Sequence, residues 1–213
     1  MDHQSTQHGL VIIPAYNEGQ SLPSLLSRLL TLYPALDVLV VNDGSTDDTA
    51  KVVSEFPVRL LSLPCNLGVA GAVHTGLLVA VQEGYDFAIQ MDGDGQHRPE
   101  QIGNLLDALV KSGSDMVVGS LFLEVEGYQS TRARRIGIWF FSRILSALCE
   151  TRITDATSGF RVWNRRAIEL LAERYPEDYP EVEVIQDGAI SCWRDLPLVL
   201  RCSRNSQWWR SSR

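Results

Sequence analysis

The sequence predicts an α/β protein with three layers, in which helices cover both faces of a mainly parallel central sheet. Short apolar runs alternate with helical patterns over the first 120 residues. The runs are apolar nearly throughout, as expected of strands that are buried on both faces of a sheet. Each run is followed by a helical pattern rather than by a tight turn, which favours parallel pairing.

Five strands are predicted, at residues 10–14, 37–42, 58–63, 85–91 and 115–119. The first helix is indicated by leucines that share one helix face: Leu22, Leu25, Leu26, Leu29 and Leu30. Ser45 and Asp48 have the spacing of a capping box, so we expect a second helix to begin at Ser45 and run to about Ser54. A third helix, rich in small residues, is expected over 70–81, and Pro99 opens a fourth.

The composition is that of a globular cytoplasmic protein. The chain has 213 residues, 45% hydrophobic and 21% charged, which suits one domain of ordinary size. A net charge of −7 argues against a nucleic-acid partner. The four cysteines lack metal or redox spacing and are expected as free thiols in a reducing compartment. No signal peptide or membrane span is expected, so the protein is soluble or lies on a membrane surface.

Three polar clusters stand where predicted strands end. They read "PAYNEG", "NDGSTDD" and "DGDGQH", and they follow the first, second and fourth strands. In open parallel sheets, ligands bind beyond the carboxyl ends of the strands. The sequence therefore predicts a ligand site built from these three segments.

The cluster "DGDGQH" carries paired carboxylates. In a nearly extended segment Asp92 and Asp94 project to the same side, and hard oxygen ligands suit Mg²⁺ or Mn²⁺. An EF-hand is excluded, because His97 and Gly103 occupy the positions that need Gly and Glu. The alternative is an acidic turn that only solvates a strand end. The position of "DGDGQH" beside two other polar strand ends favours the metal site over the acidic turn.

The other two clusters indicate a nucleotide or sugar. Ser45 is interpreted as a helix cap, which leaves Asp43 free to accept a hydrogen bond from a base N–H or a ribose hydroxyl. Pro14 is expected to end the first strand, and Tyr16 offers a stacking face. Glu18 is interpreted either as a ligand of sugar hydroxyls or as a residue that holds its own loop. The later segment "NLGVAGAVHTG" fits neither a dinucleotide fingerprint nor a P-loop.

Together these segments resemble the family 2 glycosyltransferases, whose fold is the Rossmann-like GT-A fold. The blocks "VIIPAYNE", "VLVVNDGSTDDT", "NLGVAGA" and "MDGDGQHRPEQI" occur in the family's order. A further block, "DATSGFR", is similar to the polyprenyl/dolichol-phosphate mannosyltransferase-like branch. The resemblance covers roughly residues 9–185.

The resemblance implies a hexosyltransferase that moves a sugar, with inversion, from a GDP- or UDP-sugar to a polyprenyl phosphate or a cell-envelope glycan. It implies Mg²⁺ or Mn²⁺ as cofactor, held by Asp92, Asp94 and Gln96, with the two aspartates catalytic. The implied donor-binding residues are Pro14, Ala15, Tyr16, Glu18, Asp43, Asp92, Gly93 and Asp94. The implied acceptor-binding residues are Arg135, Ser158 and Arg161.

The resemblance also divides the chain. We expect a catalytic domain over 1–185, with a nucleotide-sugar half at 9–120, an acceptor half at 121–185, and a divergent or truncated tail at 186–213. Within the acceptor half, an arginine-fringed apolar band over 136–148 indicates either peripheral contact with the inner face of the membrane or packing against protein.

Two departures from the pattern keep a second function open. Leu121 stands where relatives commonly have an arginine near the donor phosphates, and the tail does not match the family. The alternative is a non-catalytic nucleotide-sugar-binding module. A nucleotidyltransferase is disfavoured, because the first strand is followed by "PAYNEG" rather than by a glycine-rich loop with Arg or Lys.

Overall fold

The computed structural model describes residues 8–119, 158–174 and 200–202. The chain divides into two compact units, one formed by residues 1–100 and 163–175, the other by residues 101–162 and 176–213. The first unit holds most of the described residues and all of the predicted donor-binding ones.

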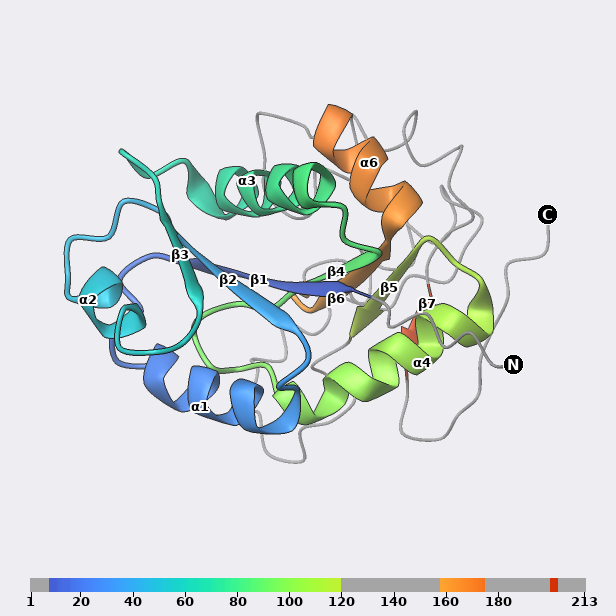
Figure 1. Cartoon of the computed structure of the whole chain (residues 1–213), viewed down its shortest axis with the longest axis horizontal. Helices are drawn as coiled ribbons and strands as arrows, with labels where there is room; N and C mark the ends of the chain where they lie inside the picture. Colours follow the sequence, from blue (N-terminus) through green and yellow to red (C-terminus); the bar gives the residue numbers. More distant parts are fainter. Residues whose placement is uncertain (1–7, 120–157, 175–199, 203–213) are drawn as a thin grey trace, which may run out of the picture. The chain divides into compact units, whose positions relative to one another are not determined.

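Four parallel strands form the centre of the first unit (Figure 1). They are β1 (Gly9–Ala15), β2 (Asp37–Asn42), β3 (Arg59–Ser62) and β4 (Phe87–Gln90). Their order in the sheet is β3-β2-β1-β4, and each neighbouring pair is parallel. Every residue of β1 is buried, and Ile12 lies opposite Leu39 on one side and Gln90 on the other. β1 is therefore the central strand of this unit.

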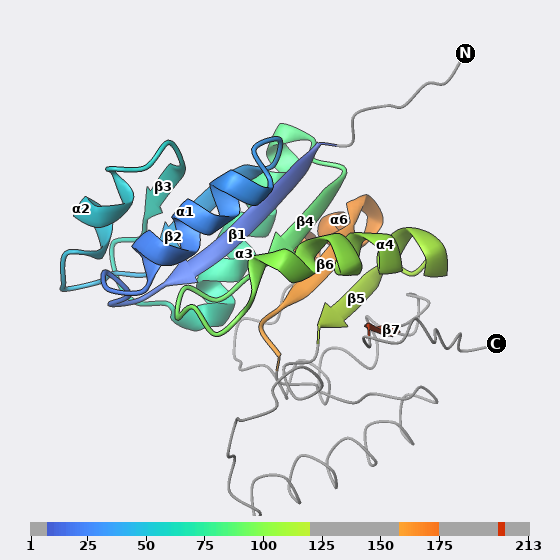
Figure 2. The same cartoon turned by 90° about the horizontal axis from the view of Figure 1, so that it is seen from below.

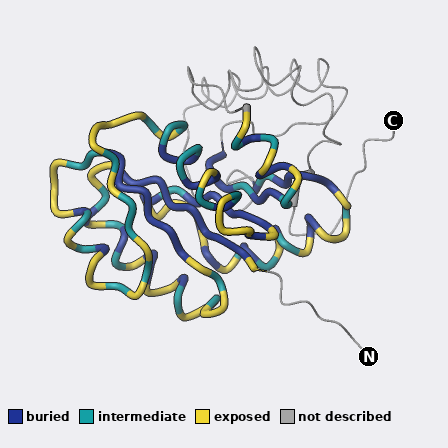
Figure 3. The backbone as a smooth tube through the Cα atoms, turned by 45° about the horizontal axis from the view of Figure 1, so that its top comes forward, coloured by how far each residue is buried: buried dark blue, intermediate teal, exposed yellow. Residues whose placement is uncertain are grey.

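Helices lie on both sides of these strands, which gives the predicted three layers. Figure 1 shows α3 (Gly68–Glu83) and α6 (Arg165–Arg174) on one side and α1 (Leu22–Leu32) on the other. The short α2 (Thr49–Val53) packs beside α1. Buried residues dominate β1, β2 and β4, while many loop and helix residues and the ends of the edge strand β3 are exposed (Figure 3).

Two local features explain how closely the helices pack. Helix α1 buries Leu22, Leu25, Leu26 and Leu29, the face that the leucine spacing predicts. Helix α3 lies so near β1 that a Cβ atom at Gly76 would overlap the side chain of Ile12. The small residues of α3 thus permit close contact between helix and sheet.

The second unit contributes α4 (Ile102–Ser112), preceded by a single 3₁₀ turn (Pro99–Gln101). It also holds β5 (Met116–Gly119) and β7 (Leu200–Cys202), which pair in parallel. Strand β6 (Arg161–Asn164) crosses the boundary between the units. All five predicted strands are present within three residues of their expected ends, and the α/β class with a mainly parallel sheet is confirmed.

Pro14 does not end the first strand as expected, because β1 continues to Ala15. The carbonyl oxygen of Ile12 accepts a hydrogen bond from the N–H of Met91. The backbone N–H and C=O groups of Ile12, and of every second residue of β1 from it, therefore point toward β4. Pro14 is one of these residues, and β4 has already ended opposite Ile12. Among the described residues, no strand lies beside Pro14 on that side, so the N–H group that proline lacks costs the sheet no hydrogen bond.

Other predictions lie outside the described residues. They concern Arg135, Leu121, the apolar band at 136–148 and the domain boundary at 185. Within the described part of the chain, no helix is both long and apolar enough to cross a membrane.

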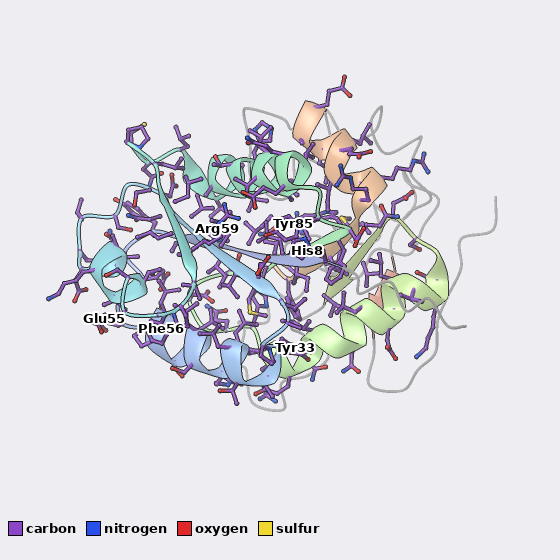
Figure 4. The ribbon with its side chains drawn as sticks, in the orientation of Figure 1. His8, Tyr33, Glu55, Phe56, Arg59 and Tyr85 are labelled. Carbon is purple, nitrogen blue, oxygen red and sulfur yellow. The ribbon has the colours of Figure 1, made fainter. Side chains whose placement is uncertain are left out.

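A polar cluster ties the strands together at their amino ends (Figure 4). The hydroxyl of Tyr85 donates to Asp37 Oδ2 over 2.8 Å, and His8 Nε2 lies 2.9 Å from the same oxygen. The rings of His8 and Tyr85 stack with centroids 4.2 Å apart. The Tyr85 hydroxyl holds the pKa of Asp37 below its usual range, while burial, helped by Asp37, raises the pKa of Tyr85 to about 12. The cluster joins residues at or beside the starts of β1, β2 and β4.

Replacing Tyr85 with Phe should lower the free energy of unfolding by about 1 kcal/mol at neutral pH, since the hydrogen bond joins a charged but half-exposed carboxylate. Asp37 has a depressed pKa, so its contribution is lost as the pH falls through the folded-state value. Tyr85 has a raised pKa, so its contribution is lost as the pH rises from about 10 to about 12. Urea unfolding of both proteins at several pH values measures the difference, which should be largest near neutrality. A difference that does not change with pH would contradict this account.

Candidate active site

The loops after β1, β2 and β4 meet at the carboxyl edge of the sheet. The N–H of Asp43 donates to the carbonyl oxygen of Ala15 over 2.9 Å, which joins the first two loops. A Cβ atom at Gly93 would lie 3.2 Å from the oxygen of Pro14 and 3.5 Å from Cγ of Glu18, so the loop after β4 packs closely against the first loop. In Figure 2, β1 and β2 run side by side to this edge. The three clusters that the sequence singled out therefore form one site.

Asp43 is held at the base of this site. It is 3% exposed, and its Oδ1 accepts a hydrogen bond from the N–H of Leu67 over 2.7 Å. Among the described residues, its Oδ2 has no hydrogen-bond partner. A carboxylate fixed in this way has one oxygen left to accept a hydrogen bond from a ligand.

The loop after β1 presents an aromatic ring and a carboxylate. Tyr16 is 48% exposed, as a stacking surface requires. Glu18 Oε2 accepts a hydrogen bond from the hydroxyl of Ser21 over 2.6 Å, and the Glu18 carbonyl accepts the N–H of Leu22 at the start of α1. Of the two interpretations of Glu18, the observed contacts are those of a residue that holds its own loop.

Asp92 is held by two buried side chains. His97, which is 2% exposed, donates from Nε2 to Asp92 Oδ2 over 3.1 Å. Gln90, 1% exposed, donates from Nε2 to Asp92 Oδ1 over 3.4 Å. The Oε1 atom of Gln90 is buried without a partner among the described residues, and such acceptors are rare. Asp92 itself stays 28% exposed, so its carboxylate is oriented yet reachable.

Asp94 does not lie in an extended segment, as the spacing argument assumed. Strand β4 ends at Gln90, and Asp94 lies in a turn whose next residue, Gly95, has φ 74°. Asp94 Oδ1 accepts the N–H of Gln96 over 2.9 Å, and both side chains are exposed. The turn places Asp94 and Gln96 beside each other instead of aligning the two aspartates by strand geometry.

The carboxylates of Asp92 and Asp94 fit a divalent cation whose remaining ligands are supplied by a substrate and by water. Among the described residues, no three His, Cys, Asp or Glu side chains are grouped to hold a metal by themselves. Mg²⁺ is commonly bound through one or two carboxylates, with phosphate oxygens and water completing the shell. Asp92 and Asp94, both partly or fully exposed, supply carboxylates of this kind.

Two of the three predicted acceptor residues are described, and both belong to one turn. Ser158 is 2% exposed, and its Oγ accepts the N–H of Phe160 over 3.2 Å. Arg161 donates from Nε to the carbonyl oxygen of Ser158 over 2.8 Å. Ser158 therefore orders a turn that orients the guanidinium of Arg161, and an acceptor role for either residue stays a prediction.

The expected helix cap at Ser45 is wrong. Helix α2 begins at Thr49, and Ser45 Oγ instead accepts the N–H of Asn17 over 3.0 Å. The carboxylate that serves the start of α2 belongs to Asp47, which accepts the N–H of Thr49 over 3.0 Å. The hydroxyl of Thr49 also bonds Asp47 and is the main reason that the pKa of Asp47 lies below its usual range. Ser45 therefore does not cap α2, and its hydroxyl instead joins the loop after β2 to the loop after β1.

Sequence reasoning missed Asn17, His97 as the partner of Asp92, and the N–H of Leu67 as the partner of Asp43. Asn17 carried a signal, since it precedes a polar turn and asparagine is one of the few residues that adopt positive φ readily. The partner of Asp43 lies on another loop, 24 residues along the chain. His97 is only five residues from Asp92, but no spacing rule marks that contact.

Comparisons with known proteins agree with this geometry. The sequence model of Glycosyl transferase family 2 matches residues 10–171. Polyprenol monophosphomannose synthase of Mycolicibacterium smegmatis is 33% identical over 171 residues, 77% of this chain and 64% of the relative. Undecaprenyl-phosphate mannosyltransferase of Micrococcus luteus is 36% identical over 172 residues, 76% of this chain and 69% of the relative. This chain thus spans about two thirds of the length of these relatives.

A solved structure supports the fold. Glucosyl-3-phosphoglycerate synthase from Mycobacterium tuberculosis, crystallised with Mn²⁺, uridine diphosphate and glucosyl-3-phosphoglycerate, superimposes with a TM-score of 0.68 at 21% identity. The superposition covers 97% of this chain and 73% of that one. The family match over most of the sequence, the two mannosyltransferase relatives and the GT-A architecture lead to one conclusion: the chain belongs to glycosyl transferase family 2.

Proposed function

We propose that this protein transfers a sugar from a nucleoside-diphosphate sugar to a polyprenyl phosphate, with inversion at the anomeric carbon. The observation that carries the proposal is the meeting, at the carboxyl edge of a parallel sheet, of the loops that bear Asp43, Asp92 and Asp94. This edge is where α/β proteins bind nucleotides. Similarity to two enzymes named for transfer of mannose to polyprenyl phosphates supports the choice of acceptor.

The donor would bind at the carboxyl ends of β1, β2 and β4. Asp43 offers an oxygen to a base N–H or a ribose hydroxyl, and the exposed ring of Tyr16 offers a face to the base. Gly93 allows the loop after β4, which carries Asp92 and Asp94, to pack against the loop that carries Tyr16. A structural neighbour contains uridine diphosphate, and the mannose-transferring relatives make a GDP-sugar an equally reasonable donor to test.

The diphosphate would lie against Asp92, Asp94 and Gln96 through Mg²⁺ or Mn²⁺. When bound there, the cation stabilises the negative charge that the leaving diphosphate acquires. His97 and Gln90 hold the Asp92 carboxylate in a fixed orientation, and the turn at Gly95 fixes Asp94. Preorganised groups of this kind do not have to reorient during the reaction.

The transfer needs no strong base from the protein if the acceptor is a phosphate. An oxygen of the acceptor phosphate forms the bond to the anomeric carbon while the bond to the donor diphosphate breaks. The acceptor oxygen is already anionic, so no proton has to be removed. Arg161, oriented by Ser158, and Arg135 are our candidates for binding that phosphate, since a guanidinium matches phosphate oxygens in charge and shape.

Asp94→Asn tests the role of the metal. Transfer should fall at least about 100-fold, because the neutral amide binds a divalent cation poorly. The free energy of unfolding should change by less than about 0.5 kcal/mol, since Asp94 is exposed. Transfer of radiolabelled sugar to a polyprenyl phosphate is the measurement, with GDP-mannose and UDP-glucose tested in parallel.

Asp107→Asn is the matched control, because Asp107 is an exposed carboxylate on α4 that pairs with Lys111. Its turnover should equal that of the unchanged protein. If Asp94→Asn retained full turnover, the metal role of Asp94 would be wrong. If the unchanged protein bound donor yet produced neither transfer nor hydrolysis, the chain would be a binding module and not an enzyme.

Asp43→Asn tests the nucleotide contact with little change in shape. The amide oxygen can still accept the N–H of Leu67, but its NH₂ group would face the ligand where an acceptor is required. Affinity for the nucleoside diphosphate should fall about tenfold or more. Titration calorimetry measures the loss, and unchanged affinity would exclude Asp43 from the nucleotide site.

A further inference from the structure

The first loop (residues 14–19) and the second loop (residues 42–49) are joined by a set of reciprocal hydrogen bonds. Consecutive backbone N–H groups of the first loop donate to side chains of the second: Asn17 to Ser45 Oγ at 3.0 Å, Glu18 to Thr49 Oγ1 at 2.9 Å and Gly19 to Asp47 Oδ2 at 3.2 Å.

In return, the side chain of Asn17 on the first loop accepts hydrogen bonds from the second loop. Asn17 Oδ1 accepts the N–H of Thr46 at 2.8 Å, the N–H of Asp47 at 3.3 Å and the hydroxyl of Thr46 at 3.3 Å. The loops are also in close contact, because a Cβ atom at Gly19 would overlap Asp48. Asn17 is thus the centre of the connection.

Asn17 meets two requirements at once. Its φ is 56°, and no other described residue except glycine has a positive φ. Asparagine tolerates this left-handed conformation better than most residues with a side chain. Its amide oxygen then supplies the acceptor for the second loop. Glycine would satisfy only the first requirement, and aspartate would satisfy both at the cost of a negative charge near Asp47.

We propose that Asn17 is a positioning residue for the donor. It sets the distance between Tyr16 on the first loop and Asp43 on the second. This proposal rests on the proposed function, because it assumes that these residues receive a nucleotide. Asn17 itself needs no contact with the ligand, and its effect passes through the geometry of the two loops.

A purely structural role would act on stability instead. The bonds of Asn17 lie at the exposed surface, where each adds little to stability. A residue that positions the donor site would change the affinity for donor more than the stability, and more than the turnover at saturating donor. The KM and kcat values of a variant therefore separate the two roles.

The test compares Asn17→Gly with Asn17→Asp. Asn17→Gly keeps the backbone conformation and removes the three contacts of Oδ1, so KM for the donor and Kd for the nucleoside diphosphate should rise about tenfold or more, with kcat changed less than about threefold. Asn17→Asp restores the acceptor and should return Kd to within about threefold of the unchanged protein. Tyr85→Phe, at the opposite edge of the sheet, is the control for a general loss of stability, and its Kd should be normal.

Amide hydrogen exchange of the ligand-free protein gives a readout that does not depend on the donor. In Asn17→Gly the N–H groups of Thr46 and Asp47 should exchange faster, because both lose their acceptor. Faster exchange with unchanged Kd and KM would overturn the positioning role and leave only a structural one. Unchanged exchange would overturn the connection itself. If the unchanged protein bound no nucleotide while its exchange matched the structure, the proposed function would fail, and the positioning role with it.

Discussion

Parallel pairing of β1 with both β2 and β4 is the constraint on which the rest of this structure depends. Because the three strands run in one direction, their carboxyl ends reach the same edge of the sheet, and the loops that follow are forced together. Close packing holds β1 in place, since Gly76 of α3 lies directly against the side chain of Ile12. A polar cluster at the opposite edge holds the starts of these strands.

The site gathers carboxylates and orients each of them by hydrogen bonds. The N–H of Leu67 holds Asp43, His97 and Gln90 hold Asp92, and the N–H of Gln96 holds Asp94. Three carboxylates therefore gather at this edge of the sheet. Bringing a negatively charged diphosphate to such an edge requires a cation between them. The proposed metal role thus rests on the charge of this edge and not only on the spacing of the two aspartates.

Much of this arrangement could be predicted from the sequence, because it follows from local patterns. Buried strands, the leucine face of α1 and the polar strand ends depend on periodicity and on the direction of parallel strands, which are visible in one chain. The assignment of Ser45 as a cap failed because a serine can bond either to its own helix or to a neighbouring loop, and spacing does not distinguish them. The extended geometry assumed for Asp94 failed because a turn begins once β4 ends. Asn17 could not be recognised as a connecting residue, since its partners are about 30 residues away and depend on how two loops meet.

The most direct measurement is a calorimetric titration of the purified protein with GDP-mannose, UDP-glucose and the corresponding free nucleotides, in Mn²⁺ and again with a chelator. We expect one donor and its nucleoside diphosphate to bind in the presence of the metal and the chelator to weaken binding at least about tenfold. Circular dichroism would establish that the protein is folded in both buffers. Binding of equal strength with and without metal would contradict the role given to Asp92 and Asp94, and a folded protein that bound no donor would contradict the nucleotide site as a whole.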